Sequence, residues 1–175
     1  MPDSALKPDP TEYAPFYAGY VSLVKEDDVL GVLEAQPAAL AALAARTPAE
    51  RETYRYGPEK WSVRQIFGHL VDGERVFGYR AFCISRGEAQ ALPGFDEQAY
   101  VQAGDADRRA LCDLAAEFAA VRVASLSALR RLEPADWRRQ GNANGAPVSV
   151  RALATIMAGH VRHHLGVLRS RYEVA

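Results

Sequence analysis

Cysteine is scarce in this sequence, with two residues among 175. Cys83 and Cys112 are isolated and lack the CxxC spacing of many metal and redox sites. This excludes a disulfide scaffold of the kind that holds small secreted domains together. We expect both to be reduced thiols in a reducing compartment, buried as small hydrophobic residues.

An excess of charge of either sign is also lacking. Lysine and arginine number 21 against 22 aspartate and glutamate, so no electrostatic footprint for nucleic acid or an anionic membrane is evident. The first residues, MPDSALKPDPTEYAPF, lack the apolar segment of a signal peptide. No run approaches the roughly 20 apolar residues that span a bilayer. The sequence therefore predicts a cytoplasmic protein with no nucleic-acid or membrane partner.

What the sequence does have is apolar residues, at 49% of the chain, which is enough for one core. The length predicts a single domain over residues 1–175. Within it, residues 1–20 combine several prolines with aromatic residues, so we expect an extended N-terminal arm packed on the body of the protein.

Helical spacing of apolar residues predicts four long helices and an all-α fold. The first spans about 27–46 and is kinked or divided at Pro37. The second begins after Ser62, whose capping-box partner is Gln65, and runs to about 86. The third runs from about 107 until Pro134, and the fourth follows the N-cap Ser149. Because the loops after the second and third helices are long, at least one connection can cross over the resulting four-helix bundle.

Histidine is rare but clustered, since three of the four lie within five positions of the last helix. His160 and His164 are four residues apart and both fall on the inward arc, where one helix can give two nitrogen ligands to one ion. His69 flanks the apolar arc of the second helix and can reach a neighbour. Three imidazoles form a frequent catalytic zinc set, which nickel, cobalt, manganese or iron can also occupy. We therefore predict a divalent metal site at His69, His160 and His164, with His163 set aside as a surface residue.

Other polar residues have weaker claims on the site. Asp72 lies three residues after His69. Its carboxylate can accept a proton from an imidazole or act as a base on metal-bound water, and a solvated side chain is the equal alternative. Glu74 lies on the apolar face of the second helix, where a charge needs a partner, and we predict an ion pair with Arg122. Tyr54 and Tyr56 can line a pocket mouth, but we expect them to pack on the bundle instead.

The sequence contains four short motifs in the order YRYGPEKWS, GHLVDGER, LPGFDE and GHVRHH. With these motifs in this order, the chain resembles the DinB-like superfamily, specifically its YfiT-like branch of metal-dependent enzymes. The resemblance covers almost the whole chain. It implies a four-helix bundle with a long crossover connection, a homodimer, and metal histidines that correspond to His69, His160 and His164. It also implies a set of reactions, which includes transfer of low-molecular-weight thiols such as bacillithiol or mycothiol, isomerisation of thiol adducts, and metal-dependent hydrolysis.

Two functions of different classes remain open. The first is an enzyme whose ion, with zinc or nickel ahead of manganese, iron and cobalt, activates a thiol for transfer to a small-molecule substrate, or activates water for hydrolysis. The second is a non-catalytic, stress-related metal-binding protein. A fourth protein ligand would favour the second, whereas an open position beside a pocket would favour an enzyme.

Overall fold

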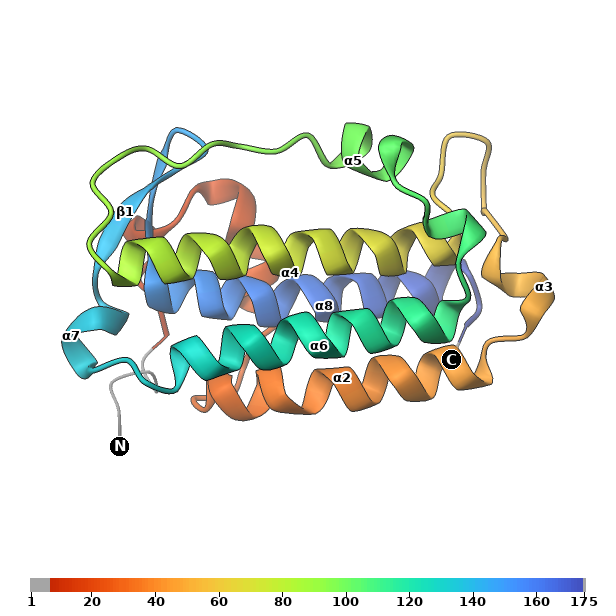
Figure 1. Ribbon diagram of the computed structural model, residues 1–175, viewed down its shortest axis with the longest axis horizontal. Helices are drawn as coiled ribbons and strands as arrows, with labels where there is room; N and C mark the ends of the chain where they lie inside the picture. Colours follow the sequence, from red (N-terminus) through yellow and green to blue (C-terminus); the bar gives the residue numbers. More distant parts are fainter. Residues whose placement is uncertain (1–6, 175) are drawn as a thin grey trace.

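Four long helices lie side by side in the computed structural model, which describes residues 7–174 (Figure 1). They are α2 (Val29–Arg46), α4 (Val63–Ser85), α6 (Leu111–Leu129) and α8 (Val150–Arg171). Helices α4 and α6 pack on each other, and each also packs on one of the other two. The predicted four-helix bundle is confirmed.

The order of directions in the bundle is unusual, because α4 and α6 are neighbours that run the same way, whereas α2 and α8 run the opposite way (Figure 1). Residues 86–110 must therefore return along the whole length of α4 before α6 begins. This crossover contains α5 (Glu97–Ala103) and a 3₁₀ turn at Ala106–Arg108. The long crossover connection inferred from the sequence is present.

Local signals fixed the starts of the two helices that matter most for function. The Ser62 side chain accepts from the Gln65 backbone N–H, and the Gln65 side chain accepts from the Ser62 N–H, so the predicted capping box opens α4. Ser149 accepts from the Ala152 N–H and opens α8 as predicted. Satisfying these first-turn donors sets where each helix begins.

Other boundaries differ from expectation. Helix α2 continues through Pro37 and is not divided there. Helix α6 covers Leu111–Leu129 rather than reaching Pro134, which instead starts the short helix α7 (Pro134–Trp137). Proline fits the first turn of a helix because the missing N–H would have no partner there. The turn α3 (Ala49–Glu52) was not predicted.

Residues 138–148, expected to be a long loop, contain a two-stranded antiparallel hairpin. Strands β1 (Gln140–Ala143) and β2 (Ala146–Ser149) pair with Ala143 opposite Ala146. The two residues between them, Asn144 and Gly145, both have positive φ, as tight two-residue hairpin turns require. The strands were missed because each is only four residues long.

The N-terminal segment is not the extended arm expected over residues 1–20, of which residues 1–6 lie outside the described part. It forms 3₁₀ turns at Pro10–Glu12 and Pro15–Tyr17, and then α1 (Ala18–Ser22). Buried Glu12 accepts from the Ser149 hydroxyl and from Arg151. Proline starts both turns, so it shapes this segment without preventing helical structure.

The expected burial of the two cysteines needs correction. Cys112 is exposed and Cys83 is half-buried, so neither is a buried core residue.

By length and hydropathy, α2 is the one described helix that could cross a membrane. Its buried residues, however, pack against α6 and α8 as a core helix does.

The core forms two apolar clusters that divide the length of the bundle between them. Helix α4 supplies Phe67 and Leu70 to one cluster and Phe77 to the other. The predicted ion pair is confirmed. Buried Arg122 on α6 donates to both carboxylate oxygens of Glu74 on α4, each at a distance of 2.8 Å. On α8, His160 lies between Ala158 of one cluster and Val161 of the other, so the candidate site lies where the two clusters meet.

Candidate metal centre

Three buried histidines meet between α4 and α8. The Nε2 atoms of His69 and His160 lie 2.8 Å apart, and one nitrogen from each of His69, His160 and His164 lies within 4.8 Å of the others. The side chains approach because α4 and α8 pack along their length, and because four-residue spacing puts His160 and His164 on one face. The structure thus brings together the three residues that the sequence predicted.

The cluster has the features expected of a divalent metal site. Metal–nitrogen bonds of about 2.1 Å place neighbouring ligand nitrogens about 3 to 4 Å apart, which the observed spacings bracket. Nε2 of His164 is buried and has no hydrogen-bond partner among residues 7–174. A buried polar atom without a partner costs about 1 to 3 kcal/mol, and coordination of an ion would remove that cost. These residues therefore fit a bound metal.

Burial also puts the imidazoles in the protonation state that binds metals. It lowers the pKa of His69 to about 4, with a smaller contribution from His163. The pKa values of His160 and His164 are held well below the usual value, first by burial and then by the neighbouring histidines. All three rings are therefore neutral at neutral pH and can donate lone pairs to an ion.

Two glycines make room around His160. A Cβ atom on Gly73 would lie 2.8 Å from Cε1 of His160, so only glycine lets α4 pass this close to the ring. A Cβ on Gly159 would overlap the backbone carbonyl of Tyr20, so this glycine lets α1 dock against α8. The position of the His160 ring thus depends on small residues in both helices.

Aromatic rings that were not predicted as site residues surround the histidines. The centroid of the Trp61 ring lies 4.7 Å from that of His69, and the Tyr20 ring lies 5.4 Å from His160 and 5.2 Å from His163. Phe77 packs edge-on against His160. Trp61 could have been suspected from its place one residue before the Ser62 cap. Tyr20 is 140 positions before His160, and no local pattern indicates that contact.

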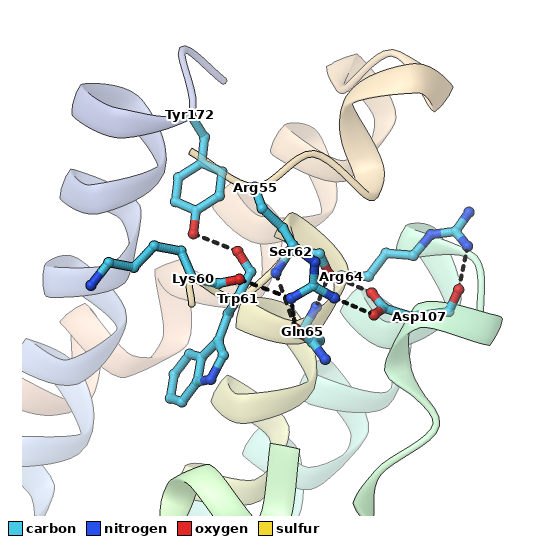
Figure 2. A network of polar contacts seen from close by, with 8 residues as sticks. All are labelled: Arg55, Lys60, Trp61, Ser62, Arg64, Gln65, Asp107 and Tyr172. Atoms are coloured by element: carbon cyan, nitrogen blue, oxygen red, sulfur yellow. Dashed lines mark hydrogen bonds and ion pairs between the residues drawn. The ribbon is translucent and has the colours of Figure 1, made fainter. Parts of the chain in front are cut away.

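A polar network fixes the loop that carries Trp61 (Figure 2). Arg55 donates to the Lys60 carbonyl over 2.8 Å and to Asp107 over 2.7 Å. Asp107 also accepts from the Ser62 hydroxyl, while the Tyr172 hydroxyl donates to the Trp61 carbonyl over 2.6 Å. The loop has no regular secondary structure, yet both of its last carbonyls are held, so the Trp61 side chain has a defined place.

A pocket of about 290 Å³ opens beside His164. Its walls come from the 56–61 loop, from the crossover and from α8, and the Trp61 Nε1–H donates to Gln98 of α5 over 2.8 Å. Its lining residues are Tyr56, Glu59, Lys60, Trp61, Ile66, Gln98, His163, His164, Val167 and Tyr172. A small molecule in this pocket would lie against one of the three histidines.

The residues to which the sequence gave weaker claims fall outside the histidine cluster. Asp72 is half-buried, and both it and His69 line a cavity of about 60 Å³. Burial raises the pKa of its carboxyl group. His163 is exposed, but it lines the 290 Å³ pocket. Tyr56 packs against Tyr172, as expected, and also lines that pocket, so its exclusion from the site was wrong in part.

Comparison with known proteins gives three findings. The family model described as the DinB superfamily matches residues 33–168. The solved structure of YfiT from Bacillus subtilis, described as a probable metal-dependent hydrolase with an unusual four-helix bundle topology, is similar with a TM-score of 0.76. It is 20% identical in sequence, over 94% of this chain and 95% of that one. Among the curated proteins compared with the chain, none matches.

Proposed function

Because this chain belongs to the DinB superfamily, we propose that it is an enzyme that depends on a divalent metal ion held by His69, His160 and His164. The observation that carries the proposal is the meeting of three buried, neutral imidazoles beside a pocket. A purely structural zinc site normally has four protein ligands. Within the described residues, the cluster contains three histidines and neither cysteine nor carboxylate.

Three neutral ligands leave the charge of the ion uncompensated. A bound divalent ion supplies positive charge that lowers the pKa of a coordinated thiol or water and so makes a nucleophile at neutral pH. The protein holds the imidazoles in place through α4 and α8. Trp61, Tyr20 and Phe77 cover the rings and limit the access of bulk water. The pocket beside His164 positions the second reactant.

Transfer of a low-molecular-weight thiol to an electrophile is the first candidate reaction. A thiol that meets a divalent ion loses its proton readily and needs no general base from the protein. Water is harder to deprotonate, and a base close to it then helps. The absence of a carboxylate from the cluster in residues 7–174 therefore favours a thiol nucleophile.

The experiment is a comparison of the metal-loaded protein with its His160→Ala variant. The wild-type protein should accelerate conjugation of a low-molecular-weight thiol to a model electrophile, and the variant should lose most of this acceleration. Lys25→Met, which removes an exposed side chain outside the cluster and outside the pocket, should leave the rate close to that of wild type. Equal rates for wild type and His160→Ala would refute the proposed role of the cluster.

Metal-dependent hydrolysis is the second candidate, because YfiT, which has a similar fold, is described as a probable metal-dependent hydrolase. Asp72 is then the carboxylate to examine, since it is half-buried one turn from His69. Hydrolysis of ester and amide substrates without added thiol, lost in both His160→Ala and Asp72→Asn, would support hydrolysis over transfer. A protein that retains its ion but shows neither activity would instead be the non-catalytic metal-binding protein.

The identity of the ion and the assembly state are further proposals. We propose zinc or nickel ahead of manganese, iron and cobalt, and elemental analysis of protein purified without added metal tests this order. We also propose a cytoplasmic homodimer, the dimer being implied by the family resemblance. Light scattering of the purified protein and fractionation of the source cells measure the two properties.

A further inference from the structure

The 290 Å³ pocket beside His164 has a property that the histidine cluster does not explain, namely an available cation. Lys60 lines the pocket and is exposed. Its ammonium group lies 5.8 Å from the centroid of the Tyr56 ring, and no carboxylate pairs with it in the described part of the chain. In Figure 2 its side chain extends toward α8, on the side away from Asp107.

The backbone at Lys60 is held even though its ammonium group is free of ion pairs. Its carbonyl accepts from Arg55, and the next carbonyl, that of Trp61, accepts from Tyr172. The Arg55 guanidinium is itself fixed by Asp107. A lysine on such a loop loses less conformational entropy on binding a ligand than one on an unrestrained loop. The network in Figure 2 therefore holds the backbone from which the Lys60 side chain extends.

The pocket also borders the histidine cluster. His164 lines the pocket with its side chain buried, and its Nε2 atom has no hydrogen-bond partner among residues 7–174. The side chains of Lys60 and His164 thus line the same pocket. Its volume is near the lower limit for small-molecule sites, which suits a compact ligand.

Charge decides which ligand the pocket prefers. Glu59 also lines the pocket and opposes the charge of Lys60. With a divalent ion on three neutral histidines, however, the total charge facing the pocket is positive, because Glu59 offsets only Lys60. A ligand with one anionic group for the ion and a second for Lys60 matches this distribution.

We infer that the pocket selects thiol substrates that carry an anionic group, which forms an ion pair with Lys60 while the sulfur faces the histidine cluster. Tyr56, Trp61 and Tyr172 line the same pocket and would pack against the carbon skeleton of such a thiol. The inference rests on the proposed thiol chemistry and adds to it the class of substrate. Lys60 is in this view a specificity-determining residue rather than a catalytic one.

The test measures binding to the cobalt-loaded protein, whose visible spectrum changes when a thiolate joins the ion. Three thiols of similar size serve as probes: 3-mercaptopropionate is anionic, 2-mercaptoethanol is neutral and cysteamine is cationic. We expect the anionic thiol to bind about fivefold more tightly than the neutral one, as fits a partly exposed ion pair, and the preference to shrink in high salt. The cationic thiol should bind most weakly.

The variants separate Lys60 from the general charge of the protein. Lys60→Met should remove the preference for the anionic thiol over the neutral one, Lys60→Arg should keep it, and Lys25→Met, which removes an exposed lysine outside this pocket, should leave it unchanged. The inference is overturned if wild type binds all three thiols equally, if it prefers cysteamine, or if Lys60→Met keeps the preference. If no thiol changes the spectrum of bound cobalt, the thiol proposal itself fails together with the inference.

Discussion

The Nε2 atoms of His69 and His160 lie 2.8 Å apart, although 91 positions separate the two residues in the sequence. Both rings are buried, and burial rather than a charged partner is the main cause of their lowered pKa values. Such a pair adds little to the stability of the fold, because burial removes both rings from water and a single hydrogen bond between them offsets little of that cost. A shared metal ion gives the arrangement a physical reason.

Removal of any one of the three histidines should abolish stable metal binding. We expect about one ion per chain in wild type after dialysis, and far less in His69→Ala, His160→Ala and His164→Ala, because two imidazoles hold a divalent ion only weakly. Elemental analysis with protein quantification measures this ratio. His163→Ala is the matched control and should keep the wild-type content. A fall in His163→Ala as large as in the others would show that the ligand set is assigned wrongly.

Gly73→Ala should weaken metal binding without touching a ligand. The new Cβ would lie 2.8 Å from Cε1 of His160 and 3.2 Å from its Nδ1, so the ring or the helix has to shift. We expect the dissociation constant for zinc, measured by competition with a chelator, to rise about tenfold or more.

Gly166→Ala is the control for that substitution. Gly166 also lies in a long helix, but a Cβ there meets nothing within 4 Å. It should leave the zinc affinity unchanged and stabilise the protein by up to about 1 kcal/mol, through helix propensity alone. Equal zinc affinities for the two alanine variants would contradict the close packing of Gly73 on His160.

The metal-free protein should lose stability as the pH falls from about 6.5 to about 4. In the unfolded chain His69 titrates near its ordinary value of 6.5, whereas in the folded protein its pKa is about 4. Between these values the unfolded state binds more protons, so acid favours unfolding, by roughly 3 kcal/mol for a shift of this size. Urea unfolding of chelator-treated protein at several pH values measures the slope, and His69→Gln should make it less steep, because His160 and His164, whose pKa values are also lowered, still contribute to it. A stability that is constant over this window would contradict the burial of a neutral ring.

Loss of Arg122 should destabilise the fold strongly. Its guanidinium is fully buried and donates to Glu74, to the Leu33 carbonyl and to the Gln36 side chain. Arg122→Met leaves the Glu74 carboxylate buried without its charge partner, which costs about 3 to 5 kcal/mol. Chemical denaturation gives the change in the free energy of unfolding.

Arg130 supplies the comparison for Arg122, since it follows the same helix and pairs with Glu34 at the surface. Arg130→Met should cost at most about 1 kcal/mol, because water screens an exposed ion pair. A loss for Arg122→Met no larger than this would mean that the buried pair contributes little to the fold.

Sequence patterns predicted the parts of this molecule that depend on local physics. Ser62 and Ser149 show where helices begin because a cap satisfies donors only two or three residues away. The spacing of His160 and His164 shows that they share a face for a similar local reason. The ion pair between Glu74 and Arg122 could be predicted because a charged side chain on an apolar helix face requires a partner nearby.

The parts that escaped prediction depend on contacts between distant segments. Nothing near Tyr20 indicates that its ring covers His160, because that contact requires α1 to dock at Gly159. Lys60 and Gln98 join the pocket only because the crossover returns along the bundle to meet the loop before α4. Family resemblance supplied the overall topology, but not these neighbours.

The division of the histidines between α4 and α8 also sets an order for assembly during synthesis. Helix α8 follows every other helix of the bundle in the sequence and supplies two of the three imidazoles. A ribosome-bound chain that ends before residue 160 presents His69 alone, and one histidine cannot capture an ion in competition with the small chelators of a cell. On the proposed ligand set, acquisition of metal would therefore follow translation of the last helix, and a bound ion would mark a chain whose bundle has closed.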